Sequence, residues 1–93
     1  GTLCTVVLLD AAGRRIARCI GPSLPAAFNA ALAGLEIGPE AGSCGSAAFR
    51  RELVVSADIA TDPKWVPYRA LAREHGLASS WSQPIVARDG RVL

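Results

Sequence analysis

The chain has 93 residues, of which 51% are hydrophobic and 19% charged, and its formal net charge is +2. This length allows one small domain, and the apolar share argues against disorder. The basic residues are dispersed and form no stripe with aromatic residues, so nucleic acid is not an expected partner. No apolar run is long enough to span a membrane, so a membrane is not an expected partner either.

The cysteines also limit the class of protein. Cys4, Cys19 and Cys44 are far apart in the sequence, and His75 is the single histidine. A structural zinc site needs about four such ligands. An odd number of separated cysteines is typical of a reducing compartment. We therefore expect a cytoplasmic protein without a signal peptide, and the sequence names no cofactor.

The first half of the chain predicts a hairpin and two helices. Residues 2–10 and 14–20 are rich in aliphatic and β-branched residues and form the hairpin, the first strand being apolar enough for burial on both faces. Residues 26–34 follow Pro25 and end in glycine, which favours a helix. Residues 43–52 predict a second short helix, with Ser43 or Ser46 as its N-cap.

The second half predicts strands around one further helix. A strand is expected over 53–59 and another over 78–87, with a turn at Asp89-Gly90 and a third strand beginning at 91–93. Between the first two, Asp62 is expected to cap a turn at 63–66. A regular helix is predicted from about Pro67 to His75, and Gly76 ends it.

Four strings in this order resemble one known family. They are GPEAGSCGSAAFRRE (38–52), VVSADIATDPKW (54–65), YRALAREHGL (68–77) and SSWSQPIVARDGRVL (79–93). Together they resemble the GAF domain, in particular the GAF modules of bacterial signalling proteins that also carry PAS, diguanylate cyclase, cyclic-di-GMP phosphodiesterase or histidine kinase domains. The resemblance covers about residues 3–93. It implies an α/β (α+β) fold with a GAF/PAS-like antiparallel sheet flanked by helices.

The resemblance also implies what lies around this domain. Residues 1–93 are expected to be a single partial GAF domain, truncated at both ends. The family has a long helix before this segment and a strand and helix after it. Those terminal helices commonly form a dimer interface, so a homodimer with flanking PAS or output domains is expected.

In GAF domains, the segment that follows the position of Ile59, the next helix and the strand that corresponds to Trp81 and Ser82 border a small-molecule pocket. The resemblance therefore implies an unidentified small-molecule ligand, with aromatic walls and with Asp58, Ser80 and Ser82 as polar anchors. The alternative is that the two tryptophans pack in the core and that Asp62 is only a cap. The predicted ligand contacts are Cys44, Asp58, Trp65, Tyr68, Trp81 and Ser82.

Cys44 has two interpretations. A helix N-terminus and nearby arginines lower a thiol pKa, which favours a redox nucleophile. Free methionine-sulfoxide reductases, which are GAF proteins, have a similar Gly-x-Cys-Gly string, but they use further cysteines close upstream and on the following segments. This chain has none there. The alternative is that the chain turns tightly at Cys44 and needs small residues.

The function that we expect is a non-catalytic sensory or regulatory GAF domain of a signal-transduction protein. It would bind a small molecule or a neighbouring domain and control an output domain for cyclic-di-GMP turnover or a histidine kinase. One alternative is a redox enzyme of the free methionine-sulfoxide reductase type that uses Cys44. The other is a purely structural dimerisation module.

Overall fold

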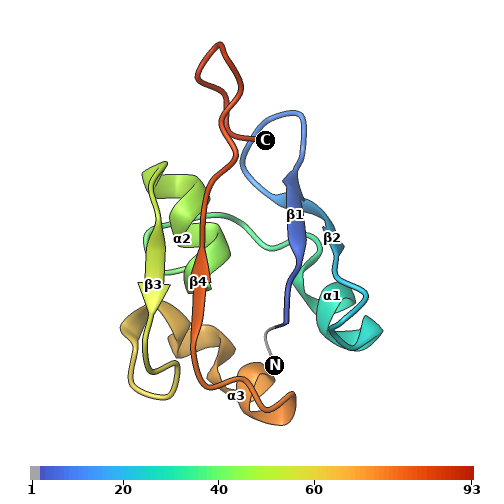
Figure 1. Cartoon of the computed structure of the whole chain (residues 1–93), viewed down its shortest axis with the longest axis vertical. Helices are drawn as coiled ribbons and strands as arrows, with labels where there is room; N and C mark the ends of the chain where they lie inside the picture. The colour runs from blue at the N-terminus through green and yellow to red at the C-terminus, as the bar shows by residue number, and fades with distance from the viewer. Residues whose placement is uncertain (1–2) are drawn as a thin grey trace.

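The computed structural model describes residues 3–93, so Thr2 in the first predicted strand lies outside it. Helices and antiparallel strand pairs both occur, which confirms the α+β class. Figure 1 shows their arrangement. In chain order the elements are β1 (Val6–Leu9), β2 (Ile16–Ile20), α1 (Ala26–Leu32), α2 (Gly42–Arg50), β3 (Val54–Ser56), the 3-10 helix η1 (Pro63–Tyr68), α3 (Arg69–Glu74) and β4 (Ser80–Ser82).

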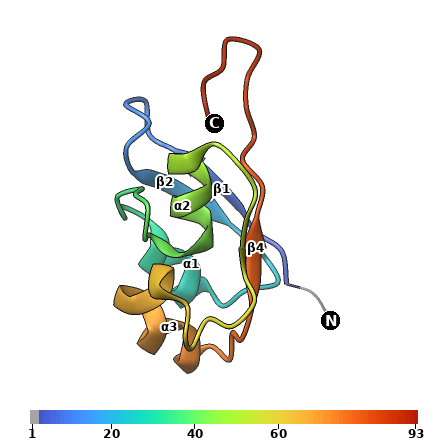
Figure 2. The same cartoon turned by 90° about the vertical axis from the view of Figure 1, so that its left-hand side faces the viewer.

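The predicted N-terminal hairpin is present, because β1 pairs with β2 in the antiparallel sense. The pairing shifts register between Leu8 and Leu9. In the connecting turn, the Asp10 carboxylate accepts the backbone N–H of Arg14 at 3.0 Å. The expectation that the first strand is buried on both faces is wrong, since Val6 is 47% exposed. The helices lie on one side of the strands, as Figure 2 shows, and leave the other face uncovered.

The two strand pairs are connected at one end by the C-terminal segment. β3 pairs with β4, and after β4 the chain forms a hairpin in which Val86 faces Val92. The last residue, Leu93, accepts the backbone N–H of Leu9 at 2.8 Å through its carbonyl oxygen. The hairpin thereby joins β1 to the strand that continues from β4 (Figure 1).

The helices bury a small apolar core against the strands. α1 packs on β2, and α2 packs on β3, β4 and η1. Ile59, Trp65 and Ala72 form the buried cluster, with Tyr68 and Leu77 partly buried beside it. The loop that follows β3 therefore shares one core with η1 and α3.

The start of α2 differs from its prediction. Its N-cap position is Ala41, and no side chain caps the helix there, so the N-cap prediction of Ser43 or Ser46 is wrong. Both serines are buried inside the helix. Ser46 still hydrogen-bonds to the backbone before the helix. Its hydroxyl accepts the N–H of Ala41 at 3.1 Å and donates to the carbonyl of Pro39 at 3.2 Å.

The helix predicted from about Pro67 begins later. η1 includes Pro67, and α3 starts at Arg69. A proline in the second turn would remove an α-helical hydrogen bond, and a short 3-10 segment takes its place. The Asp62 cap is confirmed, since its carboxylate accepts the N–H of Lys64 at 2.9 Å. Gly76 has a φ of 71°, as expected of a left-handed residue after a helix.

α2 ends on an arginine in the left-handed conformation. Arg51 has a φ of 61° and donates its backbone N–H to the carbonyl of Ala47 at 2.8 Å. Glycine is the usual residue at such a helix end, because a Cβ is disfavoured there by sterics. Within residues 3–93, Arg51 is the one non-glycine residue with a positive φ.

We predict that Arg51→Gly changes the free energy of unfolding by less than about 0.5 kcal/mol, because relief of the left-handed conformation offsets the greater entropy of the unfolded chain. Arg51→Val is expected to cost about 1–2 kcal/mol, since a β-branched residue fits that conformation least. Urea unfolding measures the change in unfolding free energy for each of the two variants. A loss well above 1 kcal/mol in Arg51→Gly would show that the arginine side chain itself stabilises the fold.

Candidate functional site

A layer of small polar side chains separates α2 from β3 and β4. Ser56 pairs with Ser80 across the two strands, so both side chains lie on the same face of the ladder. Ser82, two residues further along, shares that face. Ser43 of α2 contacts Ser80 and Ser82 from the opposite side. Ser43 and Ser56 are fully buried or nearly so, at 2% and 0% exposed.

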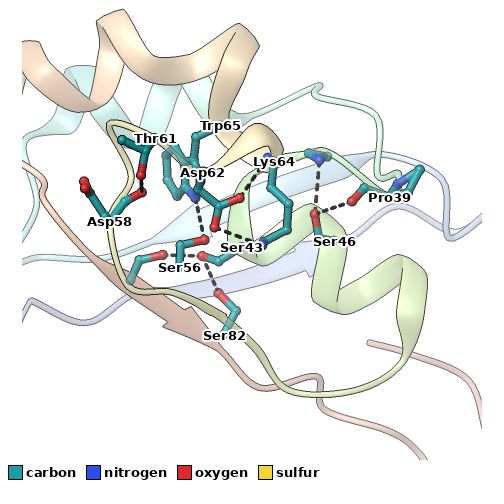
Figure 3. A network of polar contacts seen from close by, with 12 residues as sticks. Pro39, Ser43, Ser46, Ser56, Asp58, Thr61, Asp62, Lys64, Trp65 and Ser82 are labelled. Atoms are coloured by element: carbon teal, nitrogen blue, oxygen red, sulfur yellow. Dashed lines mark hydrogen bonds and ion pairs between the residues drawn. The ribbon is translucent and has the colours of Figure 1, made fainter.

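The hydroxyl groups satisfy one another, as Figure 3 shows for the labelled residues. The Ser82 hydroxyl donates to that of Ser43 at 3.0 Å, and Ser43 is also hydrogen-bonded to Ser80. The thiol of Cys44 lies 3.2 Å from the Ser82 oxygen. Buried hydroxyls without partners would be costly, so this network allows helix and sheet to approach closely.

Trp65 lies between this layer of serines and the apolar core. Its indole N–H donates to the Ser56 hydroxyl at 2.9 Å, and its side chain is 6% exposed (Figure 3). The ring packs against Gly42, where an added Cβ would lie 3.5 Å from it. Tyr68 meets the ring edge to face, with centroids 6.5 Å apart. The tryptophan is therefore held by one hydrogen bond and by close packing.

Asp62 and Lys64 form an ion pair beside Trp65. The lysine ammonium lies 2.9 Å from the carboxylate, and the two side chains are 21% and 10% exposed. Burial by itself would raise the pKa of Asp62, but the Lys64 ammonium, the Lys64 backbone N–H and the Ser56 hydroxyl together lower it below its ordinary value. Asp62 is thus an ionised cap rather than a proton donor.

The environment of Cys44 does not activate the thiol. Burial raises the pKa of Cys44, and the hydrogen bonds from Ser82 and Ser43 offset only part of that effect. A thiol with a raised pKa remains protonated at neutral pH and is a poor nucleophile. The position of Cys44 near the start of a helix, which the sequence shows, does not reveal this burial.

The six predicted ligand contacts do not gather around one space. Cys44 and Ser82 belong to the hydroxyl network, whereas Trp65 and Tyr68 pack in the core. Asp58 lies in an exposed turn, where its carboxylate accepts the N–H of Ala60 at 3.1 Å. Trp81 points away from α2 and is 67% exposed. Ligand binding by these six residues stays a prediction.

Sequence reasoning named Ser80 and Ser82 but missed the other members of the network. Ser43 was expected only as a helix cap, and Ser56 was not singled out. Strand alternation was the available signal, because it places Ser56 and Val54 on one face and Val55 on the other. The burial pattern of β3 follows that alternation, with Val55 56% exposed.

Two open cavities, of about 260 and 330 Å³, lie at the other end of α2. The turn after β1 and the C-terminal hairpin line both cavities, whereas the end of α2 lines only the smaller one. None of the six predicted contacts lines either cavity. Over residues 3–93, no three His, Cys, Asp or Glu side chains are grouped to hold a metal ion. No helix in that range has the length and apolarity to cross a membrane.

Comparison with known proteins identifies the family. The family model of the GAF domain matches residues 1–93, and the chain therefore belongs to the GAF domain family. It is 34% identical over 93 residues to a methyl sulfide methyltransferase-associated sensor of Methanosarcina acetivorans. The match covers all of this chain and 9% of that relative, so the chain spans less than a tenth of its length. No solved structure gives a significant match.

The hydrogen bond between Trp65 and Ser56 yields a stability prediction. Ser56→Ala leaves the buried indole N–H without an acceptor, which is expected to cost about 1–3 kcal/mol of unfolding free energy. A double-mutant cycle in urea checks it. In a Trp65→Phe background, which has no indole N–H, the same serine change is expected to cost clearly less. Equal costs in both backgrounds would contradict a role for the hydrogen bond.

Proposed function

We propose that this chain is a non-catalytic sensory GAF domain that regulates an output domain of a larger signalling protein. Its uncovered apolar sheet face is the observation that carries the proposal. Val55 and Trp81 are directly paired across β3 and β4, and they are 56% and 67% exposed. An exposed tryptophan beside an exposed valine indicates a contact surface for another segment or subunit.

The hairpin of β1 and β2 extends this face. Val6 and Ile20 are paired and are 47% and 42% exposed. Cys19, the neighbour of Ile20, lies on the helix side, because its thiol donates to Asn29 of α1 at 3.3 Å. Alternation along the strand therefore turns Ile20 to the face opposite the helices. Both strand pairs thus present apolar side chains away from the helix layer.

The occupant that we propose for this face is the same protein: its flanking helices and a second copy in a homodimer. The protein is proposed to be cytoplasmic, and the output is proposed to be cyclic-di-GMP turnover or a histidine kinase. The likeness to a sensor supports the regulatory role, and the resemblance to GAF modules of signalling proteins supports these outputs. Signalling would follow if the stimulus favours one arrangement of the flanking helices over another.

Trp81→Ala in the full-length protein tests this function. We expect the ratio of output activity with and without stimulus to fall towards one. The unfolding free energy is expected to change by less than about 1 kcal/mol, because the side chain is mostly exposed. Val66→Ala on η1 is the matched control, since Val66 is 57% exposed and lies elsewhere. Normal regulation in Trp81→Ala, or an equal loss in Val66→Ala, would contradict the proposal.

The redox alternative is tested through Cys44 itself. Because burial raises its pKa, we expect Cys44 to react with iodoacetamide much more slowly than the exposed Cys4, and to need a higher pH than an ordinary thiol before its reaction accelerates. Mass spectrometry follows each cysteine separately in one sample, so Cys4 is an internal control. Rapid alkylation of Cys44 at pH 7 would favour the reductase.

A purely structural dimerisation module is the remaining alternative. It predicts that Trp81→Ala weakens dimerisation while the response to the stimulus is unchanged in the dimers that remain. Sedimentation of the full-length variant beside the output assay separates the two cases.

A further inference from the structure

The smaller cavity has an apolar wall and a charged rim. Residues of the β1–β2 turn, the end of α2 and the C-terminal hairpin line it. These three segments lie towards the same end of the molecule in Figure 2. The volume of about 260 Å³ is slightly below the range usual for drug-sized ligands, so only a small molecule fits. The apolar lining consists of Leu9, Ile37, Ala48, Phe49 and Val92. Phe49 is 53% exposed, so an aromatic surface is open to an occupant.

Two arginines from separate segments line the same cavity. Arg51 follows α2, and Arg91 lies in the C-terminal hairpin. The ion pairs in residues 3–93 are Arg15 with Glu36 and Lys64 with Asp62, so neither lining guanidinium has a carboxylate within 4.0 Å there. Asp10 lines the adjoining cavity, but its carboxylate accepts the backbone N–H groups of Arg14 and Arg15.

The conformation of Arg51 adds an independent argument. Its left-handed backbone is one that glycine adopts without strain, yet the chain places an arginine there. The side chain reaches the carbonyl of Gly90, which connects the end of α2 to the hairpin that carries Arg91. Such an outlier at the rim of a cavity supports a functional role for the side chain.

We propose that this cavity binds a small organic carboxylate with an apolar body, whose charged group is held by Arg51 and Arg91. The planar guanidinium fork matches a carboxylate, and the apolar wall accommodates the remainder of the molecule. The inference deepens the proposed sensory function, on which it relies only for the consequence of binding. A ligand here contacts both α2 and the hairpin, and it would favour conformations in which these two segments stay together.

Calorimetric titration with benzoate tests the proposal in the purified protein, with benzyl alcohol as the uncharged probe and inorganic phosphate as the anion without an apolar body. We expect saturable benzoate binding with a dissociation constant below about 1 mM and much weaker binding of the other two probes. Arg51→Gln and Arg91→Gln are each expected to weaken benzoate binding about tenfold or more. Arg88→Gln is the matched control, because Arg88 is exposed in the same hairpin and lines neither cavity.

Arg51→Gly is a second variant that keeps the backbone conformation while removing the charge. It is expected to retain the unfolding midpoint and to lose benzoate binding. No saturable binding by the wild-type protein, phosphate binding as tight as benzoate binding, or an equal loss in Arg88→Gln would each overturn the proposal. The titration measures ligand binding and not the activity of an output domain. A failure to bind benzoate is therefore distinct from a failure of regulation through the uncovered sheet face that carries Trp81.

Discussion

The close approach of α2 to β3 and β4 is the constraint on which the rest of the structure depends. Serine hydroxyls from both sides meet between helix and sheet, where Ser43 of the helix is 2% exposed and accepts a hydrogen bond from Ser82. On another side of α2, Gly45 allows the preceding segment to pack on the helix, because an added Cβ would lie 2.6 Å from that of Ala41. A larger residue would move the helix, and a lost hydroxyl would leave a buried partner unsatisfied. Trp65 packs against Gly42 and donates its indole N–H to the Ser56 hydroxyl.

The two ends of α2 differ in character. Its first turn is hydrogen-bonded to β4 through the serine hydroxyls, and there Cys44 is partly buried and its pKa is raised. Its last residues border the smaller cavity, whose lining includes Phe49, Arg51 and Arg91. A ligand in the smaller cavity would therefore contact the end of a helix whose first turn is hydrogen-bonded to β4. The opposite face of that sheet carries Val55 and Trp81, so the two proposals together would connect the cavity to the uncovered face through α2 and the β3–β4 pair.

This separation of faces is consistent with a regulatory module. The helix side holds the core and the cavities, and the bare side presents apolar residues from all four strands. Asp62 is held in its ionised form by Lys64, which makes it a cap and not a catalytic acid. The membership in the GAF family and the likeness to a sensor support a sensory regulatory domain.

The sequence alone determined the family, the antiparallel hairpin, the Asp62 cap and the left-handed Gly76, because these depend on local patterns and on the order of strings along the chain. It could not determine that Cys44 is partly buried, that Trp81 faces outward while Trp65 is enclosed, or that Ser43 of α2 meets Ser80 and Ser82 of β4. Those facts depend on which faces of α2, β3 and β4 meet, and residues 37 to 39 positions apart make the contacts. Only the tertiary structure brought Arg51 and Arg91 to one cavity, because the fold joins the end of α2 to a hairpin 40 residues away in the sequence.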